Sequence, residues 1–357
     1  MAFTISKERV AELVSRLADH DVYCPAEADG VFLFRKVEGE PTLDFPNSRV
    51  PPKSVFFPQT ETMMEFEKDG SGHRFVGAKE PARGTRRILL LGGRPCDMRA
   101  ATFLDRLFRW DYDDPYYVDR RERATVIALT CTGAVPNEHC FCTSMGGSPS
   151  GTEGADMLWT DIGDRYFVEA LTGKGEAVLA AGGDVFAKAG KKDAAAAKRA
   201  KADAGERIVR RFDADGVAAA LERLFDDRYW DGVSEHCLGC GICTLLCPTC
   251  HCFDINDVVR KGEGRRERTW DTCQSAYYSV HASGHNPRPA KKHRQRNRIY
   301  HKFLYIDRNL GIVGCVGCGR CIANCPVGID IIDVAEGAKA CAGAGRQSAG
   351  ADAKGGA

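Results

Sequence analysis

The chain has 357 residues, of which 43% are hydrophobic and 28% charged, a composition typical of a globular protein with a sizeable core. Its formal net charge is +1, so the whole chain lacks the basic excess that would draw it to nucleic acid or to an acidic membrane surface. It has no apolar run of about eighteen residues and no signal-peptide pattern at its start, so we expect a cytoplasmic protein without a membrane span.

The first half of the chain has the alternating pattern of an α/β fold. The apolar spacing predicts helices at 6–20 and 97–110, strands at 31–37, 86–93 and 124–131, and a strand pair at 156–171. The order strand, helix, strand through 86–131 predicts a partly parallel sheet. The segment 174–210 is rich in Ala, Lys and Gly, so we expect an exposed helix or a linker there, before an amphipathic helix at 217–227.

Cysteine is the most informative residue type. The chain has seventeen cysteines, an odd number that a complete disulfide framework would not leave. In a reducing cytoplasm, such cysteines indicate metal binding or catalysis rather than disulfides.

Two cysteine runs share the pattern C-x2-C-x2-C-x3-C-P, which is the run of bacterial two-cluster ferredoxins. The first run consists of Cys237, Cys240, Cys243 and Cys247, and the second of Cys315, Cys318, Cys321 and Cys325. In such ferredoxins the fourth cysteine of a run ligates the other cluster. We therefore assign Cys237, Cys240, Cys243 and Cys325 to one [4Fe–4S] cluster, and Cys315, Cys318, Cys321 and Cys247 to a second. Zinc is the alternative, but zinc ribbons use two separated C-x2-C pairs instead.

A third metal site is a further prediction. Cys96 and Cys131 each follow a predicted strand, so in a parallel sheet both thiols would emerge at the carboxyl edge, where α/β folds bind ligands. The nearby C-x-C pair Cys140 and Cys142 would complete a third [4Fe–4S] site, in which Asp97 could replace one thiolate. The alternative is that these thiols are buried packing residues.

The remaining cysteines have no pattern that fixes a role. Cys250 and Cys252 follow the first run but have no copy after the second, so packing or support of the cluster is the favoured interpretation. Cys273 is undetermined, and Cys24 and Cys341 are expected to be incidental.

The segment 286–302 carries seven Lys or Arg residues and no acid. It can tune or orient the clusters, bind nucleic acid through phosphate contacts, or form a solvated loop. With few aromatic residues for base stacking, the sequence favours the first and third of these roles. We also find neither the P-loop nor the G-x-G-x-x-G motif, so no nucleotide-binding fingerprint is present.

These patterns predict an α/β N-terminal domain and a helical, two-cluster, ferredoxin-like C-terminal domain. The predicted division is 1–172 for the α/β domain, 173–227 for the Ala/Lys-rich linker and helix, 228–335 for the cluster domain with its basic insert, and 336–357 for a disordered tail.

Several stretches together resemble a known family: "GGRPCDMRA", "EHCFCTSMG", "CLGCGICTLLCPTCHCFD", "HNPRP" and "CVGCGRCIANCPVGIDI". They are similar to the 4Fe–4S dicluster subunits of redox complexes. That family includes the β subunit of sulfhydrogenase-type [NiFe] hydrogenases, the corresponding iron–sulfur subunit of anaerobic sulfite reductase, and subunits associated with heterodisulfide-reductase-like complexes. The resemblance covers about residues 86 to 335.

The resemblance implies a subunit that carries electrons between a catalytic partner and a reductase subunit that binds flavin and NAD(P). The catalytic partner would be a hydrogenase, a heterodisulfide-reductase-like complex or a sulfite reductase. We expect no catalytic residue in the chain itself. The alternatives are a metal-stabilised scaffold or nucleic-acid-binding module that uses 286–302, and a reductase that acts on its own.

Overall fold

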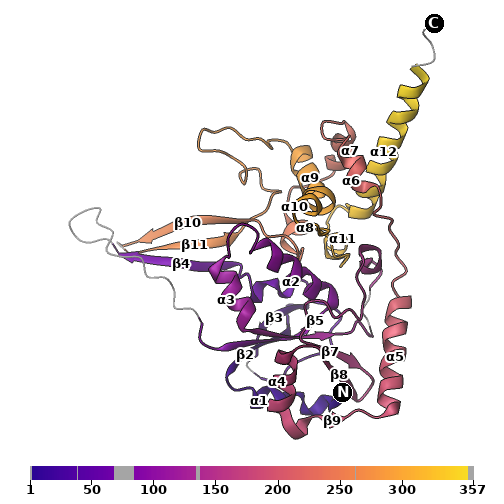
Figure 1. The fold of residues 1–357 in the computed structure, drawn as a ribbon. Coiled ribbons are helices and arrows are strands. Elements are labelled where there is room, and N and C mark those ends of the chain that lie inside the picture. Colours follow the sequence, from indigo (N-terminus) through magenta and orange to yellow (C-terminus); the bar gives the residue numbers. More distant parts are fainter. Residues whose placement is uncertain (1, 38, 68–83, 134–136, 262, 353–357) are drawn as a thin grey trace.

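The structure, a computed structural model, describes residues 2–37, 39–67, 84–133, 137–261 and 263–352. One end of the molecule is an eight-stranded sheet in the order β3-β2-β5-β6-β7-β8-β1-β9 (Figure 1). Strands β2, β5, β6 and β7 are parallel, and the other pairs are antiparallel. The strands are β1 (Ala2–Ser6), β2 (His20–Ala28), β3 (Val31–Lys36), β5 (Arg87–Gly93), β6 (Ala124–Leu129), β7 (Met157–Asp161), β8 (Arg165–Ala170) and β9 (Ala187–Lys188).

The central parallel strands are buried on both faces, which explains their continuous apolar sequences. In β5, Leu89 and Leu91 pack on one side of the sheet, whereas Ile88 and Leu90 pack on the other. Helices α1 (Val10–Arg16) and α4 (Gly173–Gly182) lie with the first core, and α2 (Pro95–Leu107) and α3 (Pro115–Arg123) with the second. The predicted parallel pairing of β5 and β6 is confirmed.

Other predictions for this part hold with changed bounds. The strand at 31–37 and the pair at 156–171 are confirmed. The helix predicted at 6–20 is shorter, because 2–6 form strand β1 and 7–9 a 3₁₀ turn. Within the Ala/Lys-rich segment, α5 (Lys191–Glu206) packs against β7 and β8 and buries Ala197 and Ala204, so it is part of the domain rather than a free linker.

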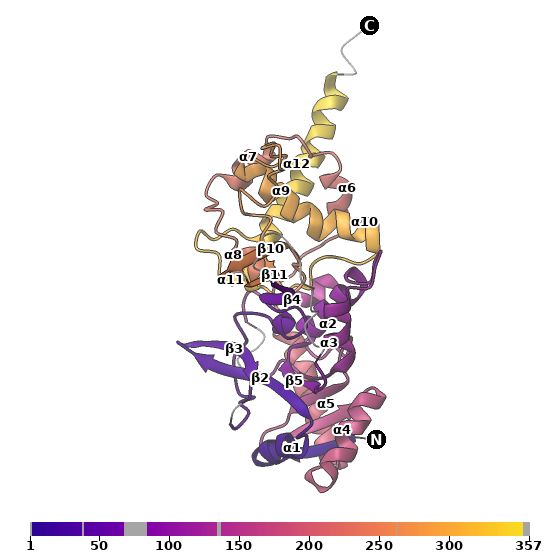
Figure 2. The ribbon, with the colours of Figure 1, turned by 90° about the vertical axis from the view of Figure 1, so that its left-hand side faces the viewer.

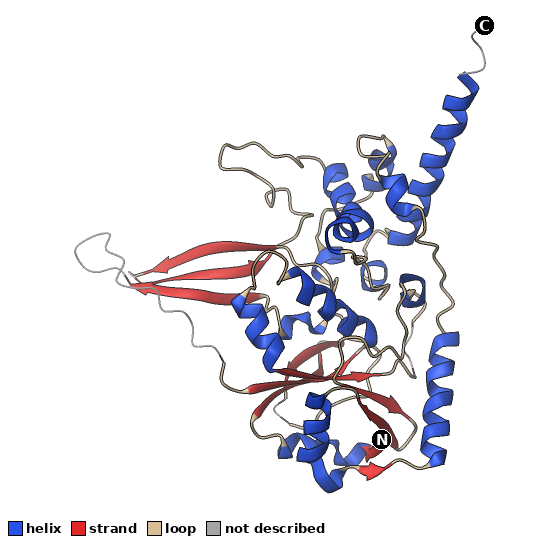
Figure 3. Cartoon of the chain, in the orientation of Figure 1, coloured by secondary structure: helices blue, strands red, loops and turns tan. Residues whose placement is uncertain are grey.

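A second, three-stranded antiparallel sheet projects from the side of the molecule (Figure 3). It consists of β4 (Thr60–Glu67), β10 (Phe253–Arg260) and β11 (Glu263–Trp270). The hairpin β10–β11 follows the first cysteine run and lies inside the C-terminal domain that the sequence predicted to be helical, so that prediction is wrong here. Strand β4 comes from the predicted N-terminal domain and pairs with β11, so this sheet joins the two predicted domains. Buried Arg268 on β11 donates to Glu61 on β4 at 2.7 Å.

The cysteine-rich half forms a helical body beyond the large sheet (Figure 2). Its helices are α6 (Val217–Leu221), α7 (Tyr229–Ser234), α8 (Ile242–Leu245), α9 (Lys291–Tyr300), α10 (Ile306–Leu310), α11 (Arg320–Ala323) and α12 (Ile331–Asp352), with a π-helical turn at His301–Tyr305. The tail from 336 was predicted to be disordered, but the structure continues α12 to Asp352; 353–357 lie outside the described residues. The Ala-rich sequence favours helix, and Ala335, Ala338 and Ala342 are buried in the same core as α6.

Candidate metal centres

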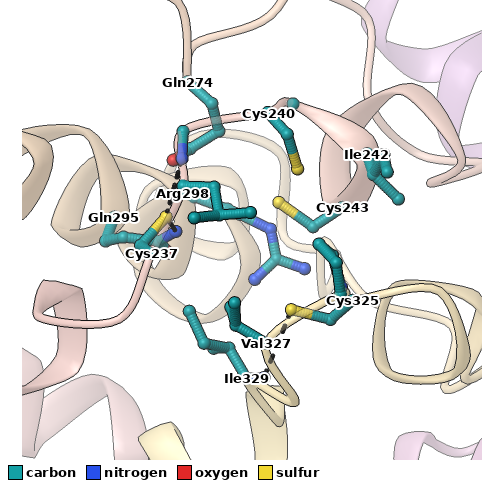
Figure 4. Close-up of a pocket in the computed structure, with 14 residues that line it drawn as sticks. Cys237, Cys240, Ile242, Cys243, Gln274, Gln295, Arg298, Cys325, Val327 and Ile329 are labelled. Atoms are coloured by element: carbon teal, nitrogen blue, oxygen red, sulfur yellow. Dashed lines mark hydrogen bonds between the residues drawn. The ribbon is translucent and has the colours of Figure 1, made fainter.

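The first cysteine-lined cavity lies between the loop that precedes α8 and the loop that follows α11. It has a volume of about 440 Å³, and its thiols are Cys237, Cys240, Cys243 and Cys325. Figure 4 shows the four sulfur atoms around one common space. Three of these cysteines belong to the first run and the fourth belongs to the second. The structure therefore brings together the set that the sequence assigns to one cluster, and their role as ligands stays a prediction.

Hydrogen-bond donors surround the sulfur atoms of this cavity. Gln295 Nε2 lies 2.8 Å from Cys237 Sγ, and the backbone N–H of Gly239 donates to the same sulfur at 3.3 Å. The backbone N–H of Ile329 donates to Cys325 Sγ at 3.2 Å. Such N–H···S bonds stabilise negative charge on a thiolate and raise the reduction potential of a cluster that it ligates.

A second cavity, of about 320 Å³, is lined by Cys315, Cys318, Cys321 and Cys247. Here the fourth cysteine comes from the first run, so the two runs exchange their last cysteines. Thr249 Oγ1 lies 3.2 Å from Cys247 Sγ. Phe141, from the loop that carries the predicted third site, forms another part of the wall.

The exchange follows from the local backbone, which is the same in both runs. Gly241 (φ 76°) caps α8 and Gly319 (φ 73°) caps α11, and both are in the left-handed region that residues with a Cβ avoid. The short helices α8 and α11 pack against each other. Cys247 and Cys325 lie just past the ends of these helices, so each reaches the cavity of the other run.

The cavities have buried cationic side chains in their walls, which shows what charge a bound cofactor should have. Arg298 and Lys302 are each only 4% exposed, and within the described residues neither forms an ion pair with a carboxylate. Arg298 lines both cavities, and its Nε has no hydrogen-bond partner. Uncompensated buried cations cost several kcal/mol each, so an anionic group must face them. A [4Fe–4S] cluster with four thiolates is such a group, and the residues present fit it.

Burial disfavours ionisation of thiols in both cavities. Burial raises the pKa of Cys243 to about 11 and that of Cys315 to about 12. Without a metal these side chains would be neutral at pH 7, whereas coordination removes the proton. Burial lowers the pKa of Lys302, but the negative charge that Cys247, Cys250 and Cys315 would carry as thiolates outweighs burial and raises that pKa above the usual value.

The basic segment 286–302 turns much of its charge inward. Arg294, Arg298 and Lys302 recur every four residues along α9 and the π-helical turn, and all three are buried. Lys292 is paired with Asp231 at 2.9 Å, and Arg296 with Asp226 at 3.2 Å. The alternatives of a solvated loop and of a nucleic-acid-binding arm are therefore not supported.

Comparison with known proteins agrees with this geometry. Residues 236–329 match the family described as the 4Fe–4S dicluster domain. Over 334 residues the chain is 30% identical to the sulfhydrogenase 2 subunit beta of Pyrococcus furiosus, an alignment that covers 92% of this chain and 96% of that protein. The chain belongs to this family of 4Fe–4S dicluster electron-transfer subunits. No solved structure matches it.

Membership of the dicluster family makes the chain an iron–sulfur electron-transfer subunit of an oxidoreductase complex. Within the described ranges, no helix is both long and apolar enough to cross a membrane.

The residues predicted for a third site are only partly brought together. Cys140 and Cys142 lie in one small buried cluster, and both are close enough to Cys131 to affect its pKa, which burial raises to about 12. Cys96 lies in the first turn of α2, within electrostatic reach of Cys131 and of Cys318 in the second cavity. Cys131 lies two residues past the end of β6, near the predicted sheet edge.

Asp97 has a different partner from the one that the sequence suggested. Arg320, on α11, donates to both of its carboxylate oxygens, at 2.5 and 3.0 Å, and both side chains are buried. Arg320 also donates to the Ser48 carbonyl at 3.0 Å. These contacts fasten the second cysteine run to the α/β domain, so the structure gives Asp97 a role in joining the two parts rather than in holding a metal.

Sequence reasoning missed the residues that connect the cavities. The i, i+4, i+8 spacing of Arg294, Arg298 and Lys302 could have indicated one inward face of a helix. Lys53 is also buried, and it donates to the carbonyl oxygens of Cys247 and Cys250 at 2.9 and 2.7 Å. It lies far away in the sequence, and nothing in its local pattern indicates this position.

Proposed function

We propose that the chain relays electrons, through two [4Fe–4S] clusters, between a partner that binds flavin and NAD(P) and a hydrogenase-type catalytic partner in a cytoplasmic complex. The observation that supports this most is the exchange of cysteines between the two cavities, with Cys325 in the first and Cys247 in the second. Iron–sulfur clusters exchange single electrons, and two that share a wall of the protein form a relay.

The chain's own residues hold the relay and set its electrostatics. The eight cysteines of the two runs would be the ligands. Arg298 contributes to both cavities, so its charge stabilises the reduced form at either one. The N–H···S bonds to Cys237 and Cys325 act in the same direction at the first cavity.

The partners are proposed from the relative. The name of the Pyrococcus furiosus protein is that of a sulfhydrogenase subunit, which favours a hydrogenase over a heterodisulfide-reductase-like or sulfite-reductase-like partner. The flavin- and NAD(P)-binding partner follows from the resemblance of the cysteine motifs alone. We retain 1–172 and 228–335 as the two functional parts, although strand β4 links them.

A third [4Fe–4S] cluster at Cys96, Cys131, Cys140 and Cys142 remains part of the proposal. It is supported by the mutual proximity of Cys131, Cys140 and Cys142 and by the buried Arg94, which lies within electrostatic reach of Cys96 and Cys131. Because Asp97 is occupied by Arg320, the four thiols would have to be sufficient.

Anaerobic purification of the full chain tests the proposal. We expect about eight irons per chain from the two runs, or about twelve with a third cubane, and magnetically interacting clusters in the electron paramagnetic resonance (EPR) spectrum after reduction. Zinc in place of iron would refute it. A Cys96→Ala, Cys142→Ala double variant should lose about four irons, and an unchanged count would remove that third site.

Co-purification under anaerobic conditions then identifies the partner. A hydrogenase subunit together with a flavoprotein is the expected result, and a sulfite reductase or a heterodisulfide-reductase-like subunit would correct it. Turnover by the isolated chain with an artificial electron donor would instead show an enzyme in its own right.

A further inference from the structure

A third cysteine-lined cavity lies beside the two ferredoxin cavities, and neither cysteine run accounts for it. Its thiols are Cys250, Cys252 and Cys273. Cys250 and Cys252 follow the first run directly, whereas Cys273 follows strand β11, so the hairpin β10–β11 brings the three together.

His251 supplies a fourth donor of the kind that metal sites use. Its Nδ1 lies 3.1 Å from the carbonyl oxygen of Thr249, and a carbonyl can only accept, so Nδ1 carries the proton. The other ring nitrogen, Nε2, is then unprotonated. A histidine that donates one N–H to a backbone carbonyl and keeps the other nitrogen as a base has the arrangement found in metal-bound imidazoles. His251 lines this cavity with the three thiols.

The surroundings of these thiols repeat those of the first cavity. Gln274 Nε2 lies 3.6 Å from Cys273 Sγ, as Gln295 Nε2 lies close to Cys237 Sγ. Gln274 and Gln295 are both almost fully buried. The side chain of Tyr278 is hydrogen-bonded to Cys252. Amide and hydroxyl donors directed at buried sulfur would stabilise negative charge on it once it ligates a metal.

The cationic wall of this cavity is also shared with the other two. Arg298 lines all three cavities, and Lys302 lines the second and the third. Lys302 Nζ donates to Thr249 Oγ1 at 2.6 Å, so this ammonium lies between Cys247 of the second cavity and the thiols of the third. An anionic occupant of the third cavity would face the same buried charges as the two ferredoxin clusters.

We infer that this cavity holds a further [4Fe–4S] cluster, ligated by Cys250, Cys252 and Cys273 through sulfur and by His251 through Nε2. The inference adds a site to the proposed electron-transfer function and rests on it. A single metal ion fits less well, because in the described parts of the chain no three His, Cys, Asp or Glu side chains are grouped around one ion. The same is true of the two ferredoxin cavities, whose cysteines are spread around a larger space.

The location gives this cluster a specific place in the relay. Cys250 follows Cys247, a predicted ligand of the second cluster, by three residues, and the two thiols are close enough to affect each other's pKa. Arg298 bridges to the first cavity. The cluster would therefore lie within short electron-transfer distance of both others and form a branch or a bridge between them.

Iron and sulfide analysis of single variants tests the inference in the anaerobically purified full chain. Cys252→Ala and Cys273→Ala should each lose about four irons and four sulfides relative to the unaltered chain, with the EPR signals of the other clusters retained. Cys24→Ala and Cys341→Ala are matched controls, since both thiols lie outside every cavity described above, and they should lose none. An unchanged iron count in the Cys252 and Cys273 variants would overturn the inference, as would zinc bound there.

His251→Cys provides the second test, which does not depend on losing the cluster. It should retain the full iron content but change the EPR g values of one cluster and lower its potential, because thiolate replaces imidazole. Full iron content with an unaltered spectrum would exclude His251 as a ligand. A chain with about eight irons, all sensitive to the two ferredoxin runs, would remove this site and leave the proposed function standing, whereas a chain without iron would remove both.

Discussion

The two ferredoxin cavities have the same cysteine pattern and the same local backbone, yet they differ in what surrounds them. The first is open: Cys240 is exposed, and Leu238 on its rim is 65% exposed. The second has no exposed thiol, and its run packs onto the loop 139–142 of the α/β domain, where the Phe141 N–H donates to the Gly317 carbonyl at 2.9 Å. The sequence repeat therefore creates two equivalent sites, and the rest of the chain makes them different.

This difference assigns a separate task to each cavity. A cluster with an exposed ligand is placed to exchange electrons with another protein, whereas a cluster whose run packs against the α/β domain is placed to exchange them inside the chain. The buried ion pair of Arg320 with Asp97 fixes the second run to that domain, whereas the first run has Gln274 and Gln295 as its neighbours. Substitutions at these contacts test whether the two cavities differ in this way.

Alanine at the equivalent glycines Gly317 and Gly239 should give the largest contrast. Both have positive φ, 66° and 70°, so alanine is strained at either by ~1 kcal/mol or more. At Gly317 a Cβ would also lie 2.6 Å from the Cα of Cys142, whereas at Gly239 its nearest neighbour is the Gln274 carbonyl at 3.8 Å. We expect Gly317→Ala to be the more destabilising by roughly 2 kcal/mol, on the order of other overpacked sites.

The measurement is thermal unfolding of the two anaerobic holo-variants side by side, with iron content as a second readout. Gly317→Ala should unfold at the lower temperature and lose iron from the second cluster. Equal unfolding temperatures would mean that the second run does not pack on the loop 139–142 as closely as the structure has it.

Removing the charge of Lys302 should change the difference between the reduction potentials of the two ferredoxin clusters. At an effective dielectric constant of about 20 and a separation of about 7 Å, one charge contributes ~2.4 kcal/mol, about 100 mV for a single electron. The reduced cluster is the more negative state, so loss of a cation disfavours reduction and lowers the potential. Lys302 lines the second cavity but not the first, so of the two ferredoxin clusters Lys302→Met should lower mainly the potential of the second.

Potentiometric titration followed by EPR measures this shift. Lys302→Arg keeps the charge and serves as the control, with a much smaller change expected. Equal shifts of both clusters in Lys302→Met would contradict the separate surroundings of the two cavities.

The parts of the molecule that could be predicted from the sequence are those encoded locally. The geometry of the runs at 237–247 and 315–325 follows from the cysteine spacing and the glycine positions. The strands β5 and β6 follow from continuous apolar stretches. Strand β4 and the hairpin β10–β11 were missed because β10 is mostly exposed and β11 is rich in charged residues, so neither has the apolar alternation of a half-buried strand. Their pairing also joins segments that lie far apart in the sequence, which no local pattern encodes.

At the candidate metal centres, too, the sequence predicted only what is encoded locally. The crossing of Cys247 and Cys325 was predictable because it belongs to a repeated motif, whereas the third cavity requires Cys273 to return beside Cys250 and Cys252 through the hairpin. The position of Lys53 depends on tertiary packing in the same way. Asp97 was named as a residue that could replace one thiolate because it adjoins Cys96, and nothing in the sequence indicated that its carboxylate pairs with buried Arg320.

The variant with the smallest expected effect on structure is on the rim of the first cavity. Leu238 and Val327 are partly exposed apolar side chains beside Cys240, and exposed apolar residues next to a redox centre favour contact with a partner protein. Leu238→Gln should leave iron content and unfolding temperature nearly unchanged, within about 0.5 kcal/mol, because the side chain buries little surface. It should slow electron transfer with the partner complex several-fold, measured by stopped-flow oxidation of the reduced subunit. Val209→Gln is the matched control, since Val209 is 75% exposed but does not line the cavity. Equal rates in the two variants would mean that electrons leave the chain by another face, and the second cluster would then be the one to test for contact with a partner.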